Sequence, residues 1–137
     1  MAAPKVLVLA SETISGDVVR EAIGADRAED AEVLVVAPAL NSKLRFLASD
    51  PDGAIERAEE VQEESVQQMN EEGLDAAGDT GESDPIQAIQ DALATFRAEE
   101  IVICVHREGK KNWLEEGVVD EVKKLYPDRQ VRHVEVG

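Results

Sequence analysis

The sequence has one cysteine, two histidines, few aromatic residues and no apolar run long enough to cross a bilayer. The lone Cys104 excludes an internal disulfide and agrees with a reducing compartment. The histidines and the cysteine show no metal-ligand spacing, which argues against a zinc site. Since aromatic residues make up only 3%, we expect a core of Val, Ile, Leu and Ala. No nucleophile can be paired with a base, so we expect no enzyme activity and no catalytic residue.

The amino-terminal stretch MAAPKVLVLA predicts a first strand rather than a signal peptide, because Lys5 alone makes a poor positively charged region. We therefore expect a cytoplasmic location. A length of 137 residues predicts a single domain covering 1–137. A hydrophobic content of 43% with 32% charged residues is typical of a globular protein rather than a disordered one.

Acidic residues dominate the charge, with thirty Asp and Glu against fourteen Lys and Arg and a net charge of −16. Nucleic acids and anionic membranes bind clustered positive charge, so neither is an expected partner. We interpret the acidity as solvated helix faces that favour solubility. Adaptation to a high-salt cytoplasm is the alternative, and the sequence leaves it open.

Apolar runs and turn residues predict strands that alternate with helices along the chain. A short, polar strand at 74–78 is typical of a sheet edge, and 79–83 indicates a turn-rich linker. One helix begins at Ser15 and ends at Gly24, and another begins at Asp84 and Pro85. The expected strands are 5–10, 31–37, 74–78, 100–105 and 131–136, and the expected helices run over 15–24, 50–72, 84–96 and 112–125. Ile86, Ile89, Leu93 and Phe96 would form the buried face of the third helix, and Leu114, Val118, Val122 and Leu125 that of the fourth.

This alternation predicts a three-layer α/β fold with a parallel sheet and right-handed crossovers. A doubly wound strand order with the first strand central is expected, of either the flavodoxin-like or the nucleotide-binding type. Ligands in such sheets bind where the strand order reverses, outside the carboxyl ends of the strands. Residues 11–13 would then face residues 106–111 across that crevice.

The loop after the fourth strand is locally basic, with His106, Arg107, Lys110 and Lys111 opposed only by Glu108. Arg and Lys side chains suit phosphate, so this loop can form an anion site. The alternative is a solvated loop that the acidic body of the protein attracts. The unperturbed pKa of a histidine side chain, about 6.5, suits His106 to act as an acid or a base. The alternative is that His106, at a strand end, serves only as a hydrogen-bonding group.

The whole chain resembles the universal stress protein family. The resemblance rests on the stretch KVLVLASET, the long acidic helix after the second strand and the final VRHVEV. It also includes a Gly-x-x-Asp-Pro-x-x-Ala-Ile element, formed by Gly81, Asp84, Pro85, Ala88 and Ile89. The resemblance implies a three-layer sandwich with a five-stranded parallel sheet in the order 3-2-1-4-5, a Rossmann-like fold of the adenine-nucleotide α-hydrolase type.

The ATP loop of the family is altered in this sequence. ATP-binding members carry a Gly-x-x-Gly pair after the fourth strand and later a Gly followed by Ser or Thr. Here Val105 stands at the first glycine position, and Glu108 or Gly109 at the second. Gly117 matches the late glycine, but Val118 follows it. Ser11 also stands where ATP-binding members have an aspartate after the first strand.

Together these features predict a non-enzymatic binding or regulatory module of the stress response that is not a standard ATP binder. The alternative is a sensor that binds ATP, AMP or another anion through the basic loop. The residues placed around such a ligand are Ser11, Thr13, Ala37, His106, Arg107, Gly109, Lys110, Lys111 and Gly117. Family members commonly pair through the last strand.

The resemblance therefore implies a homodimer with an interface of Val131, Arg132, His133, Val134, Glu135 and Val136. Antiparallel pairing of two copies would cover the exposed edge of each sheet. A monomer whose edge is guarded by Arg132 and Glu135 is the alternative.

Overall fold

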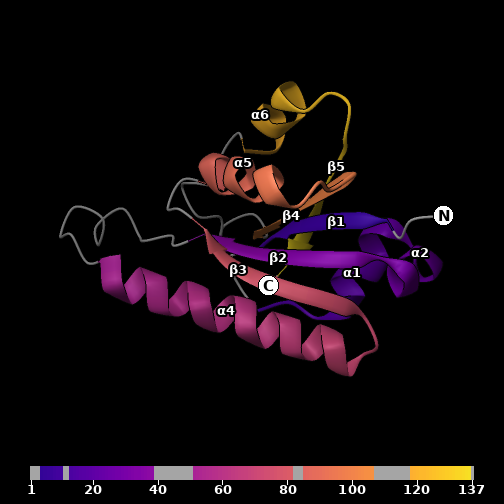
Figure 1. Ribbon diagram of the computed structural model, residues 1–137, viewed down its shortest axis with the longest axis horizontal. Coiled ribbons are helices and arrows are strands. Elements are labelled where there is room, and N and C mark those ends of the chain that lie inside the picture. Colours follow the sequence, from indigo (N-terminus) through magenta and orange to yellow (C-terminus); the bar gives the residue numbers. More distant parts are fainter. Residues whose placement is uncertain (1–3, 11–12, 39–50, 82–84, 107–117, 137) are drawn as a thin grey trace.

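The computed structural model describes residues 4–10, 13–38, 51–81, 85–106 and 118–136. A five-stranded sheet lies between two layers of helices (Figure 1). In chain order the elements are β1 (Lys5–Leu9), α1 (Gly16–Ile23), α2 (Ala25–Asp30), β2 (Glu32–Pro38), α4 (Pro51–Glu71), β3 (Asp75–Gly81), α5 (Pro85–Thr95), β4 (Glu100–His106), α6 (Val118–Leu125) and β5 (Gln130–Val136). Among these described helices, none is long and apolar enough to cross a membrane.

The strands lie in the order β3-β2-β1-β4-β5, and every neighbouring pair is parallel. The predicted order 3-2-1-4-5 is confirmed. β1 is central, and its Leu9 pairs with Val36 of β2 on one side and Ile103 of β4 on the other. β3 and β5 are therefore the two edges, and the strand order reverses between β1 and β4.

Most of the core belongs to two aliphatic clusters, one on each face of the sheet, because successive strand residues point to opposite faces. α1, α2 and α4 cover one face, and α5 and α6 cover the other (Figure 1). On the first face, strand residues pack against helix residues, namely Val6, Val8, Val33, Val35 and Val102 against Val19, Ala28 and Met69. Leu7, Leu9, Ile101 and Ile103 pack with Ile89, Leu93 and Val122 on the second. Cys104, the single cysteine of the sequence, is buried in the first cluster.

Gly24 ends α1 as predicted, with a φ of 96° and its N–H 2.8 Å from the carbonyl oxygen of Arg20. Glycine suits this left-handed conformation because it has no Cβ. Ser15 occupies the N-cap position, although its hydroxyl makes no capping hydrogen bond. A second helix, α2, follows directly and was not predicted. Ala28 is its only buried residue, so these six residues show no helical spacing of apolar side chains from which the helix could be predicted.

Two predicted segments need correction. The linker predicted at 79–83 is wrong for its first part, since β3 continues to Gly81 and pairs with β2 as far as Pro38. The backbone pairing with β2 holds Asp79 and Gly81 extended, although both residue types are disfavoured in strands. Leu125 was predicted in the core but is 44% exposed, because the last turn of α6 buries only Val122. The predicted start of this helix near Asn112 lies outside the described residues.

Candidate functional site

The carboxyl ends of β1 and β4 lie side by side at the point where the strand order reverses. In open α/β sheets this position forms the ligand-binding crevice. Ala10 follows β1, is fully buried, and donates its N–H to the carbonyl oxygen of Val36 at 3.1 Å. The adjacent chain is thereby fixed to β2. The point where the strand order reverses therefore lies where it was predicted, between the carboxyl ends of β1 and β4.

Helix α4 contacts the residues that follow β1 through two hydrogen bonds. Thr13 Oγ1 donates to Glu64 Oε2 at 2.9 Å, and both side chains are exposed. The backbone N–H of Ile14 donates to Ser65 Oγ, also at 2.9 Å, inside the protein. Ser65 is fully buried, so its hydroxyl satisfies a buried backbone donor rather than meeting water. The loop after β1 is therefore attached to the middle of α4.

The predicted ligand-binding residues fall into two groups. Thr13 lies in the described loop, and Ala37 is fully buried at the end of β2, packed with Ala58 and Val61 of α4. His106 is the last residue of β4, where its backbone pairs with Val136. Six residues of the predicted set lie outside the described residues, namely Ser11, Arg107, Gly109, Lys110, Lys111 and Gly117. Of the predicted set, the structure therefore describes only Thr13, Ala37 and His106.

The predicted interface strand β5 forms one edge of the sheet. Val131 and Val134 are half-buried and pack against opposite core clusters, whereas Arg132 and His133 are exposed. Glu135 and Val136 continue the strand, paired through their backbone with β4. The edge therefore combines apolar side chains with a backbone row that has no strand beside it among the described residues.

A charge cluster at the amino ends of the strands was not predicted. Glu100, only 3% exposed, forms ion pairs with Arg27 of α2 and with Arg132 of β5, whose Nε lies 3.5 Å from Glu100 Oε2. That oxygen is buried and has no hydrogen-bond partner among the described residues. Both arginine side chains are about half exposed, at 44% and 45%. The cluster ties a helix, a central strand and an edge strand together.

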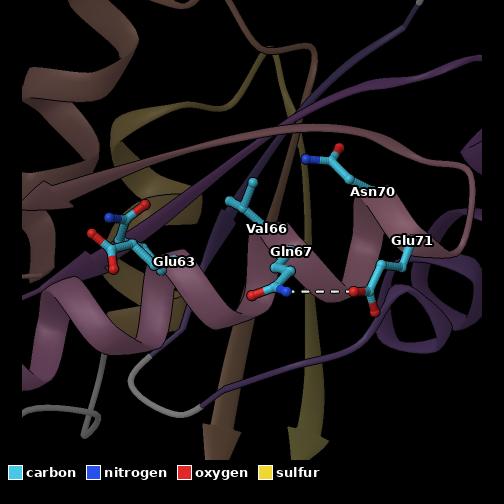
Figure 2. A pocket seen from close by; sticks show the side chains of 6 residues that line it. Glu63, Val66, Gln67, Asn70 and Glu71 are labelled. Atoms are coloured by element: carbon cyan, nitrogen blue, oxygen red, sulfur yellow. Dashed lines mark hydrogen bonds between the residues drawn. The ribbon is translucent and has the colours of Figure 1, made fainter.

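A surface hollow of about 510 Å³ runs along one flank of α4. Figure 2 shows it lined by two rows of side chains at a spacing of four residues. Asn70 and Val66 rise toward β3 in the first row, while Gln67 and Glu71 form a hydrogen bond of 3.4 Å in the second. The rows are Gln62, Val66 and Asn70, and Glu63, Gln67 and Glu71.

Neither the charge cluster nor the hollow offers a metal site, since no group of three potential ligands occurs in the described part of the chain. Sequence patterns gave little indication of these features. Glu100 opens an apolar run and looked like an ordinary strand boundary, and Ser65 sits in a helix rich in polar residues. Their roles follow from tertiary contacts with residues far along the chain. The single signal available was the alternation that places Glu100 on the same face as Val102.

Comparisons with known proteins bear on the fold. No family model matches the sequence, and no curated protein matches it significantly. Among solved structures, a universal stress protein family protein from Arabidopsis thaliana with AMP bound is 13% identical, covers 98% of this chain and 92% of its own, and gives a TM-score of 0.62. A universal stress protein from Archaeoglobus fulgidus is 22% identical, covers 97% of this chain and 98% of its own, also with a TM-score of 0.62. The chain has the fold of the universal stress proteins.

Proposed function

We propose that this protein is a non-enzymatic binding or regulatory module of the stress response whose crevice does not take ATP in the manner of the nucleotide-binding universal stress proteins. The fold supports the first part, because the likeness to universal stress proteins extends over nearly the whole chain. The second part is argued from one contact of a residue predicted to surround the ligand, the hydrogen bond from Thr13 to Glu64.

That contact is unfavourable for a phosphate group. A threonine hydroxyl has a single hydrogen to donate, and here the carboxylate of Glu64 accepts it at 2.9 Å. The carboxylate also brings negative charge beside Thr13, one of the residues predicted to surround the ligand, where it would repel a nucleotide phosphate. Together with the altered glycine loop, this contact supports a module that acts through its surface rather than through a nucleotide.

A second candidate function is a sensor of AMP or another anion. The Arabidopsis neighbour has AMP bound, and in this chain the basic residues Arg107, Lys110 and Lys111 follow β4 in the sequence. In this alternative, the basic side chains would hold the phosphate in place of glycine N–H groups, with charge attraction exceeding the repulsion from Glu64.

The proposal is tested by removing the carboxylate that faces Thr13. Glu64→Gln keeps the size of the side chain and an oxygen that can accept from Thr13, but removes the charge. We expect AMP to bind about fivefold more tightly to this variant than to the wild type, the effect of one unit charge ~4 Å away in water. Chemical-shift titration by NMR measures such weak affinities directly.

Glu63→Gln is the matched control, since it removes the same charge from the neighbouring residue, which lines the hollow on α4 instead. The control should bind AMP as weakly as the wild type does. Equal affinities for AMP in the wild type and both variants would show that Glu64 does not oppose nucleotide binding.

A further inference from the structure

The exposed edge at β3 differs from the one at β5 in being bordered by a helix. Asn70 of α4 reaches this edge, and its Oδ1 accepts a hydrogen bond from the N–H of Ala76 at 3.2 Å. That N–H therefore points away from β2. In a parallel ladder, alternate residues turn their N–H and C=O groups toward the same neighbour. Ala76, Gly78 and Thr80 consequently present their backbone groups outward, and Ala77 and Asp79 present theirs to β2.

The first row of the hollow forms a floor beside this edge. Gln62 and Val66 lie so close to Gly78 that a Cβ there would meet the Gln62 side chain and would stand 2.9 Å from Val66 Cγ2. Because glycine leaves this space open, the helix can lie close beside the strand. The floor is thus built from one apolar and two amide side chains, with the outward backbone groups of β3 along its margin.

Carboxylates border the floor on both sides. Glu63 and Glu71 in the second row are exposed, and so are Asp75 and Asp79 on β3. Between residues 58 and 81 the chain contains eight acidic residues and no Lys or Arg. The negative charge therefore extends along the whole margin of the hollow.

These observations identify one class of occupant. An extended peptide can add a strand to an open sheet edge, with backbone hydrogen bonds giving affinity and side-chain contacts giving specificity. A second copy of this chain would oppose Glu63, Glu71 and Asp75 with the same charges, which disfavours pairing of two β3 edges. A basic segment would place Lys or Arg side chains near these carboxylates. Asn70 already gives Ala76 the kind of hydrogen bond that an added strand would give to Gly78 and Thr80.

We propose that the β3 edge and the bordering hollow on α4 form a docking site for an extended, basic segment of a partner protein. The segment pairs with the outward groups of Gly78 and Thr80, and its basic side chains contact Glu63 and Glu71. The site involves the β3 edge rather than the carboxyl ends of β1 and β4, and it does not depend on any nucleotide.

The probe for this site is a fluorescein-labelled peptide of about eight residues in which lysine and valine alternate, the length of an ordinary strand. Its control has the same charge but two valines replaced by proline, which cannot pair as a strand. Fluorescence anisotropy at physiological salt should show that the alternating peptide binds at least about tenfold more tightly than the proline peptide. Equal affinity for the two peptides, or no binding of either, would overturn the proposal.

Variants distinguish a defined site from general attraction to an acidic protein. The double variant Glu63→Gln/Glu71→Gln should weaken binding of the alternating peptide about three- to tenfold. Glu21→Gln/Glu29→Gln, on exposed positions of α1 and α2, changes the charge equally and should leave the affinity within about twofold. Equal losses in both double variants would mean non-specific attraction and would contradict the site.

The proposed backbone pairing between the peptide and β3 is tested separately. Thr80→Pro removes an outward N–H while leaving the pairing of β3 with β2 intact, so it should weaken the peptide about tenfold. In the wild-type complex, amide exchange of Gly78 and Thr80 should slow, while that of residues on β5 should not change. Protection of β5 instead would place the peptide elsewhere, and a doubled mass that Thr80→Pro abolishes would show that a second copy occupies the β3 edge. Either result would refute the proposal.

Discussion

Glu100 is the residue whose environment differs most from that of a typical glutamate in this protein. Its carboxylate is removed from water beside β1, yet two arginines from separate elements reach it. A buried ion pair contributes little over an apolar pair, because desolvation offsets the attraction. Breaking such a pair is costly, however, since it leaves one charge buried and uncompensated. Removing the arginine side chains of this cluster should therefore lower the stability of the protein.

Removing both cations should destabilise the protein strongly. We expect Arg27→Ala/Arg132→Ala to lower the free energy of unfolding by about 3–5 kcal/mol, because the carboxylate of Glu100 stays buried without a partner. Either single substitution should cost less, since the other arginine remains. Urea unfolding followed by circular dichroism measures these differences.

Arg97→Ala serves as the matched control for the loss of arginine, because Arg97 is exposed. Adding Glu100→Gln to the double variant should recover part of the lost stability, since the buried charge is then gone. A double variant as stable as the Arg97→Ala control would mean that Arg27 and Arg132 do not stabilise the buried carboxylate of Glu100.

Single residues also show where sequence reasoning reached its limit. Gly24 and Gly73 could be predicted as helix ends, because glycine is common just after a helix. Both have a positive φ in the structure, a conformation that favours glycine. Ser65 and Glu100 could not be predicted, since an isolated polar residue looks the same whether it faces water or a partner distant in the chain. Thr13 was expected near the crevice, but its carboxylate partner lies fifty-one residues away.

Among the elements, those with strong periodic or β-branched patterns were predictable and those held by tertiary contacts were not. β1 and β4 are apolar runs, and their existence and pairing follow from that pattern. The sequence of β3, DAAGDTG, contains no β-branched residue except threonine, so its full length depends on the partner strand β2. The six-residue helix α2 was missed because it buries a single alanine.

The β5 edge carries the prediction of a homodimer. We expect the wild type to have about twice the monomer mass of 14.9 kDa in analytical ultracentrifugation. His133→Glu should weaken the dimer at least about tenfold, since antiparallel pairing of two β5 strands would bring added carboxylates together in an already acidic protein. His133 is exposed, so the substitution should leave the monomer folded.

Leu125→Glu is the control, because Leu125 is exposed on α6 rather than on the edge strand. It adds the same charge and should leave the dimer mass unchanged. A wild type with the monomer mass at micromolar concentration would contradict the dimer. A dimer equally weakened by both substitutions would point to net charge rather than to β5.

At the scale of the whole molecule, the charge of −16 acts on every element. Self-repulsion among like charges destabilises the compact state, and salt screens it over about 8 Å at physiological ionic strength. The described ion pairs offset only part of this repulsion, since arginines and lysines are fewer than half as numerous as the acids.

Raising the KCl concentration should therefore stabilise the protein. We expect an increase in Tm of about 3–10 °C between low salt and ~1 M KCl, corresponding to roughly 1–2 kcal/mol of unfolding free energy. Chloride is the right anion, because sulfate would also strengthen apolar burial. A Tm that falls or stays constant with KCl would show that the acidic surface does not limit stability.

The central claim is that this universal-stress-protein fold does not take nucleotides in the standard way, and titration calorimetry of nucleotide-stripped wild-type protein with AMP and ATP tests it most directly. We predict no saturable binding up to millimolar nucleotide at physiological salt. Binding at micromolar strength would contradict the claim and favour the sensor. The triple variant Arg107→Ala/Lys110→Ala/Lys111→Ala would then show, by loss of that binding, whether the basic loop is responsible.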